Sequence, residues 1–169
     1  MRHLALLLPA LLVACATSHE HTGFHFQGSA GFAAIGDEGI GGTVSAAGGA
    51  AVQPNLILGA QVWGSGVGVI IEETEQYGFG PMLKYYFMPA NVYVSATPSF
   101  VWATRSGLFD EGREEWGFGL RAAIGKEWFV SEGWGLGIGG VFDVTTATFE
   151  DDDRSTAMGG AVVFSASFD

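Results

Sequence analysis

The chain has 169 residues and a formal net charge of −11, with 18 acidic residues against 7 basic ones. This acidity excludes nucleic acid as a partner, because binding a phosphate backbone requires a basic surface. The sole cysteine, Cys15, excludes an intrachain disulfide.

The start of the chain has the pattern of a secretory signal peptide. Arg2 supplies a positive charge, and residues 4–13 form an apolar run that is too short for a membrane-spanning helix of about 20 residues. Cleavage after Ala16 fits the small residues that follow, whereas a lipobox-like stretch favours cleavage before Cys15, which would then be lipidated. Both outcomes stay open. The predicted organisation is a signal peptide at 1–16, a short periplasmic leader at 17–22 and a single β-barrel domain at 23–169.

Eight segments after the signal alternate between apolar and small or polar residues. In the clearest segment, Trp134, Leu136 and Ile138 alternate with glycines. A period of two residues gives a strand one apolar face and one small or polar face. Pro81 and Pro98 fall inside two of these segments and predict local kinks. The predicted strands lie at about 23–35, 40–52, 56–63, 77–87, 92–102, 116–124, 134–144 and 158–168.

The connections between these segments are of two kinds. Tight turns are predicted at 54–55, 89–91 and 130–133, where proline, asparagine or glycine occurs. The connections at the opposite end are longer, except for the short one near 36–39, and are predicted at about 64–76, 105–115 and 146–156. Short turns at one rim and longer loops at the other are typical of outer-membrane barrels.

Charge follows the same division. Of the 18 acidic residues, 13 fall in the four connections of the long-loop end, and the apolar stripes carry essentially none. A soluble sandwich would carry polar side chains on its outer strand faces. Several tryptophans, such as Trp102, Trp116 and Trp134, lie near strand ends, as in interfacial girdles. We therefore predict an all-β, eight-stranded antiparallel up-and-down transmembrane barrel whose apolar face meets lipid.

Three stretches resemble a known class of proteins. They are residues 78–87, the pair 125–131 and 134–137, and the terminal Val163-Phe164-Ser165-Ala166-Ser167-Phe168. Together they are similar to the small eight-stranded outer-membrane barrels that include the outer-membrane proteins A and X. The resemblance implies insertion by the barrel-assembly machinery, which reads a C-terminal signal. Here the aromatic residue is penultimate, because Asp169 follows it.

The inward faces carry polar and charged residues that need partners. An eight-stranded barrel is just wide enough to be filled by side chains, and buried charges must be paired or hydrated. We predict an internal network in which Lys84 and Arg121 pair with Glu127 or Asp143. The alternative is a narrow polar path or a small-ligand pocket. The predicted lumen network consists of His25, Gln61, Lys84, Arg121, Glu127 and Asp143.

Catalytic and metal sites are not predicted. A lipid-hydrolysing barrel needs a serine or threonine beside a histidine at the outer rim, and His25 lies near the other rim. His19, His21 and His25 have metal-ligand spacing, but the first two are expected in a flexible leader. Weak cation candidates in a solvated loop are Glu150, Asp151, Asp152 and Asp153.

The sequence therefore predicts a non-enzymatic barrel in the outer membrane of a Gram-negative bacterium. Its role would be structural or surface-interacting, with a filled lumen, acidic extracellular loops and no cofactor. A small transport or ligand-binding barrel with a wet interior is the alternative, and an exported soluble barrel of lipocalin type is a third reading. Expected partners are outer-membrane lipid, lipopolysaccharide and the barrel-assembly machinery, and the protein is expected to be a monomer.

Overall fold

The computed structural model describes residues 19–35, 39–69, 72–107, 110–148 and 154–169. Within these ranges no helix is long and apolar enough to cross a membrane. The strands are β1 (Phe24–Ile35), β2 (Ile40–Gln53), β3 (Leu56–Val69), β4 (Glu72–Phe87), β5 (Val92–Gly107), β6 (Asp110–Phe129), β7 (Trp134–Thr148) and β8 (Arg154–Phe168).

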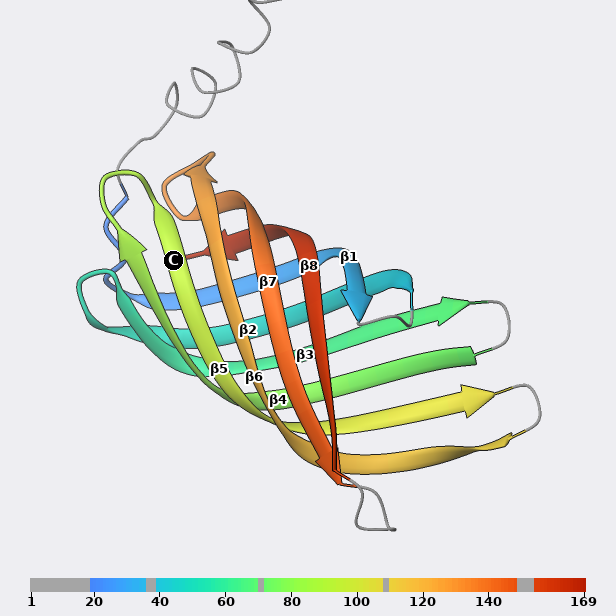
Figure 1. Cartoon of the computed structure of the whole chain (residues 1–169). Helices are drawn as coiled ribbons and strands as arrows, with labels where there is room; N and C mark the ends of the chain where they lie inside the picture. The colour runs from blue at the N-terminus through green and yellow to red at the C-terminus, as the bar shows by residue number, and fades with distance from the viewer. Residues whose placement is uncertain (1–18, 36–38, 70–71, 108–109, 149–153) are drawn as a thin grey trace, which may run out of the picture.

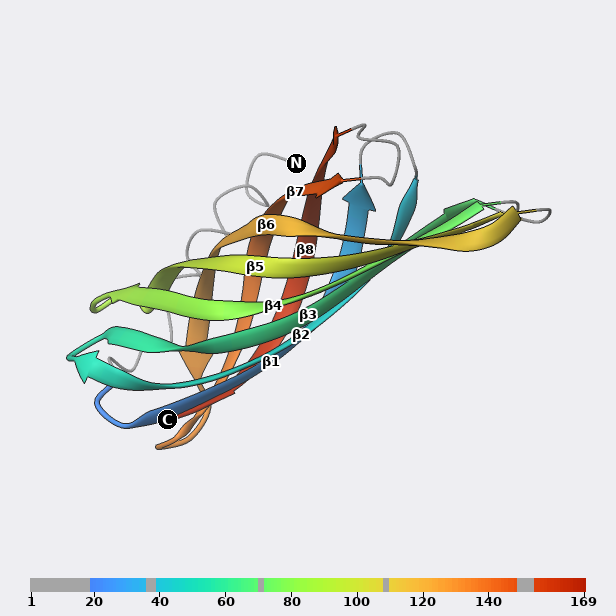
Figure 2. The same cartoon turned by 90° about the horizontal axis from the view of Figure 1, so that it is seen from below.

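The strands form one closed barrel. Each strand pairs antiparallel with the next in sequence, and β8 returns to pair with β1, where Phe26 lies opposite Phe168. Figure 1 shows this up-and-down order, and Figure 2 shows the same wall from below. Closure leaves the sheet without an exposed edge. The predicted eight-stranded antiparallel barrel is confirmed.

The period-two pattern sorts side chains between the two faces of the wall. In β6, Leu120 is 49% exposed on the outer face, whereas the next residue, Arg121, is 3% exposed and faces the lumen. The same sorting occurs in every strand, so large apolar side chains cover the outer wall on all sides. Exposed examples, one from each strand in order, are Phe32, Val44, Val62, Phe79, Phe100, Phe118, Phe142 and Phe164.

Tight turns join the strands at one rim. Asn55 and Asn91 have positive φ angles of 65° and 50°, a conformation that asparagine tolerates well in turns. The backbone N–H of Tyr86 donates to the carbonyl of Asn55, and the N–H of Glu127 donates to the carbonyl of Asn91. These bonds tie each turn to the end of a neighbouring strand, and Figure 1 shows the C-terminus at this same rim. The turns predicted at 54–55 and 89–91 are confirmed.

At the other rim the strands are longer than predicted. Much of the segments 64–76, 105–115 and 146–156, predicted as loops, continues the ladder; for example, Glu75 in β4 pairs with both Gly66 and Thr104. The physical reason is that backbone pairing does not require apolar side chains. A strand can therefore continue past its apolar stretch, losing the alternating pattern without losing its backbone hydrogen bonds.

The two strand prolines affect one ladder. Between β4 and β5 the pairing runs to Phe79 opposite Phe100 and resumes at Leu83 opposite Ala96. Pro81 and Pro98 lie in this gap, since proline has no N–H to donate. On its other side Pro98 still pairs with Leu120 of β6. The predicted irregularity is thus local to the contact between β4 and β5.

Candidate functional site

The lumen contains a charged centre built around Lys84. The Lys84 side chain is fully buried, and its Nζ lies 3.1 Å from Glu127 Oε1 and 3.2 Å from His25 Nε2. The same Nζ lies 4.1 Å from the ring centroid of Tyr93, within cation–π range. One ammonium group therefore has a carboxylate, an imidazole and an aromatic face around it.

Glu127 also accepts hydrogen bonds from two other strands of the barrel. Gln27 in β1 donates through Nε2 to Oε1 at 2.8 Å, and Ser167 in β8 donates through Oγ to Oε2 at 2.8 Å. Both carboxylate oxygens thus accept hydrogen bonds in addition to the Lys84 contact. A buried ion pair needs such extra hydrogen bonds to offset its desolvation.

A second charged centre lies nearer the long-loop rim. Arg121 Nη1 lies 3.6 Å from Asp143 Oδ2, and Nη2 donates to Thr43 Oγ1 at 3.1 Å. The guanidinium also lies 4.8 Å from the ring centroid of Trp63. The structure therefore brings Lys84 to Glu127 and Arg121 to Asp143.

Gln61 belongs to a separate set of neutral hydrogen bonds in the lumen. Its Oε1 accepts a hydrogen bond from Thr97 at 2.8 Å, and its Nε2 donates to Ser45 Oγ at 3.3 Å. Ser45 in turn shares a hydrogen bond of 2.7 Å with Ser29. All six residues predicted for the lumen network therefore have polar or charged partners in the interior.

Large apolar and aromatic side chains also fill the lumen, which sequence reasoning did not anticipate. Ile57, Met82, Tyr86 and Tyr93 are at most 3% exposed and form a buried cluster around Lys84. Inward glycines make room for them. A Cβ at Gly125 would lie 2.6 Å from the Tyr93 hydroxyl oxygen, so any side chain at this position would collide with the Tyr93 ring.

The turn rim holds a histidine cluster. His21 is 1% exposed and its ring stacks on Tyr86 at 3.5 Å, while its backbone exchanges hydrogen bonds with Asn55. Expecting His21 in a flexible leader was wrong, because this packing fixes it inside the barrel mouth. The sequence contained a signal for this burial. Inward-facing residues of β1 have odd numbers, and residues 19, 21 and 25 continue the same alternation into the leader.

Asp169 lies at the centre of this cluster. Its Oδ1 is 2.5 Å from His25 Nδ1, and its Oδ2 is 2.6 Å from His21 Nδ1. Burial alone would raise the pKa of Asp169, but the two imidazoles outweigh it and hold this pKa well below the usual range. The side chain is therefore a carboxylate at neutral pH.

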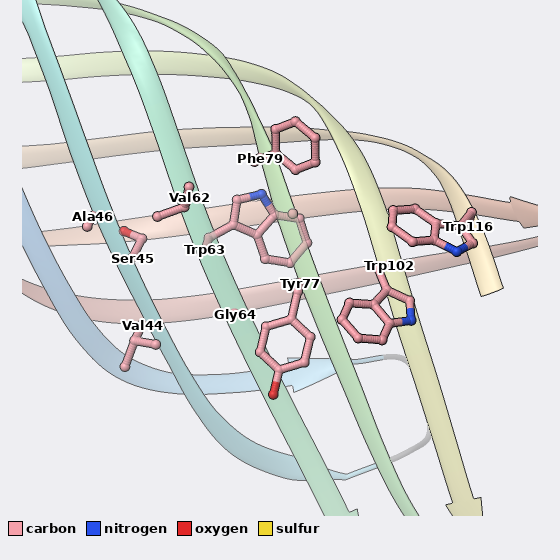
Figure 3. Close-up of a pocket in the computed structure, with 11 residues that line it drawn as sticks. Val44, Ser45, Ala46, Val62, Trp63, Gly64, Tyr77, Phe79, Trp102 and Trp116 are labelled. Atoms are coloured by element: carbon pink, nitrogen blue, oxygen red, sulfur yellow. The ribbon is translucent and has the colours of Figure 1, made fainter. Parts of the chain in front are cut away.

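The outer wall carries an apolar hollow of about 540 Å³. Figure 3 shows the rings of Tyr77, Trp102 and Trp116 side by side along its edge, with Val44 and Val62 opposite. Such a lining offers contact to hydrocarbon chains rather than to polar ligands.

Some predicted candidates lie outside the described residues. They are the possible lipidation site and the four weak cation ligands, namely Cys15, Glu150, Asp151, Asp152 and Asp153.

Comparison of the whole chain with solved structures agrees with this geometry. Neisserial surface protein A matches with a TM-score of 0.73 and 15% identity, over 87% of this chain and 97% of that one. The protein has the fold of the small outer-membrane β-barrels. Ail, the attachment invasion locus protein of Yersinia pestis, matches with a TM-score of 0.50 and 10% identity, over 87% and 98% of the two chains. No protein-family model and no curated protein sequence matches the chain.

Proposed function

We propose that this chain is a non-enzymatic barrel of the bacterial outer membrane with a structural or surface-interaction role. The main support for this proposal is the apolar outer wall. Every strand contributes large exposed apolar side chains to it, such as Phe118 at 66% exposure and Phe164 at 60%. Water would strongly disfavour an apolar surface of this extent, whereas a bilayer accepts it. A lipocalin-type barrel would have the opposite arrangement, with apolar residues inward.

The filled lumen supports a structural role over transport. Trp63, Tyr86 and Tyr93 occupy the interior at 4%, 0% and 3% exposure, and the cations of the two ion pairs lie beside these rings. Outer-membrane lipid and lipopolysaccharide are the proposed partners of the wall, including its apolar hollow. The acidic residues clustered in the long-loop segments are proposed to face outside the cell.

Planar-bilayer recording tests this reading. The purified barrel is expected to show little or no steady conductance, because side chains occupy the lumen at several levels. A variant with Trp63→Ala and Tyr93→Ala should pass more current, while the wall variant Phe118→Ala should behave like the original protein. Large, stable channels from the unaltered protein would overturn the structural reading and favour the transport alternative.

A further inference from the structure

Three donor atoms converge at the turn rim, one carboxylate oxygen and two imidazole nitrogens. Asp169 Oδ2 lies 2.6 Å from His21 Nδ1 and 3.7 Å from His19 Nε2. Within the described residues, neither ring nitrogen of His21 nor this oxygen makes a hydrogen bond of acceptable geometry. The His21 side chain is 1% exposed and that of Asp169 is 4% exposed. Buried polar atoms in native proteins usually have partners, and a bound ion is one explanation when they do not.

His25 has a different role from His19 and His21. Its Nε2 lies 3.2 Å from the Lys84 ammonium, which can only donate, so Nε2 accepts and the neutral ring carries its proton on Nδ1. That proton is donated to Asp169 Oδ1 at 2.5 Å. Lys84 is fixed in turn by Glu127. This series of contacts orients the carboxylate so that Oδ2 points to His21, as outer partners orient the ligands of metal sites.

We propose that His19, His21 and Asp169 bind one divalent transition-metal ion at the periplasmic mouth of the barrel, with His25 as a positioning residue. Two imidazoles and one carboxylate suit zinc, copper, nickel or iron(II) rather than magnesium or calcium. Tetrahedral zinc with bonds of about 2.0–2.1 Å requires neighbouring donor atoms about 3.3 Å apart. The observed separations of 2.6 and 3.7 Å from Asp169 Oδ2 bracket that value, so each of these two distances needs to change by less than an ångström. The His19 ring, whose centroid lies 5.4 Å from that of His21, must also turn toward His21 to complete the site.

The surroundings allow such a shift. His19 is the most accessible ligand, with a side chain 25% exposed, and its ring stacks on Phe129 with a centroid distance of 4.1 Å. A ring at the surface can slide on its aromatic neighbour, whereas His21 is fixed between Tyr86 and Asn55. The metal would join the leader to the residue that follows β8, and a fourth position would remain open to water.

Metal titration of the folded barrel in detergent tests the proposal. The protein must carry no histidine tag, and heat-modifiable gel migration must first show that each variant is folded. Calorimetry with Zn²⁺ is expected to give one equivalent per chain, and Co²⁺ should give the visible absorption bands of a nitrogen- and oxygen-ligated ion. His21→Ala and Asp169→Asn should each weaken binding at least tenfold, and His25→Gln should weaken it by about 10–100-fold.

Two further variants complete the test. His19→Ala alters a partly exposed side chain of the leader, so it should fold normally and still weaken Zn²⁺ binding. Glu132→Gln removes an exposed carboxylate in the 130–133 turn of the same rim and should leave binding unchanged. Absence of Zn²⁺ binding at millimolar concentration would overturn the proposal. Equal affinity in the folded His19→Ala or His21→Ala proteins would also overturn it, because the ion would then bind elsewhere.

Discussion

Replacing Leu120 by arginine is expected to lower the free energy of unfolding in a lipid bilayer by about 2–4 kcal/mol. Leu120 is 49% exposed on the outer wall of β6 and lies between Pro98 of β5 and Val144 of β7, well inside the strand. A guanidinium at this depth must leave water or distort the bilayer. In a water-soluble barrel the same surface change would cost no more than about 0.5 kcal/mol.

Denaturant unfolding from phospholipid vesicles measures this cost. The matched control is Val130→Arg, since Val130 is 64% exposed but lies in the turn that follows β6. Its cost should stay near about 0–1 kcal/mol, because the penalty falls toward the interface. Equal, small costs for both variants would show that the outer wall of β6 does not face lipid.

Replacing Lys84 by methionine is expected to have a still larger effect, about 3–5 kcal/mol of lost stability. The substitution keeps the shape of the chain but removes the ammonium that lies 3.1 Å from Glu127 Oε1. Glu127 would stay buried with its charge uncompensated, and His25 would lose a donor. Most of the expected cost comes from leaving the Glu127 carboxylate buried without a counter-charge. The loss of the attraction between Lys84 and Glu127 contributes less.

A double-mutant cycle separates these contributions. Adding Glu127→Gln to Lys84→Met should recover much of the lost stability, because a neutral amide no longer needs a counter-charge. Lys126→Met serves as the control, since Lys126 is partly exposed and its Nζ bonds the Ala90 carbonyl at 2.6 Å. Its unfolding free energy should change by no more than about 0.5 kcal/mol. A Lys84→Met barrel as stable as the Lys126→Met control would contradict the buried ion pair.

The facing of individual side chains could be predicted from the sequence. The two-residue period alone places Leu120 and Arg121 on opposite faces of the wall. The assignment of the apolar face to lipid then puts Leu120 outward and Arg121 inward. The turns at 54–55 and 89–91 follow from the conformational preferences of proline and asparagine. These are local properties, and local sequence determines them.

Contacts across the lumen could not be predicted in the same way. Gln27 in β1 reaches Glu127 in β6, and Thr43 in β2 reaches Arg121. Such partners depend on how far each strand is staggered when the sheet closes, and no short segment encodes that stagger. The burial of His21 likewise depends on Tyr86, which lies far along the chain.

Thiol labelling on intact cells tests the central claim, an outer-membrane barrel with its turns in the periplasm, most directly. Cys15 is predicted to be removed or lipidated, so Thr156→Cys near the long-loop rim and Glu132→Cys at the turn rim each supply one thiol. Both positions are exposed, and Thr156 pairs with Thr146 near the ends of β7 and β8. A membrane-impermeant maleimide should label Thr156→Cys on intact cells and Glu132→Cys only after lysis. Labelling of Glu132→Cys on intact cells, or of neither variant before lysis, would contradict the account.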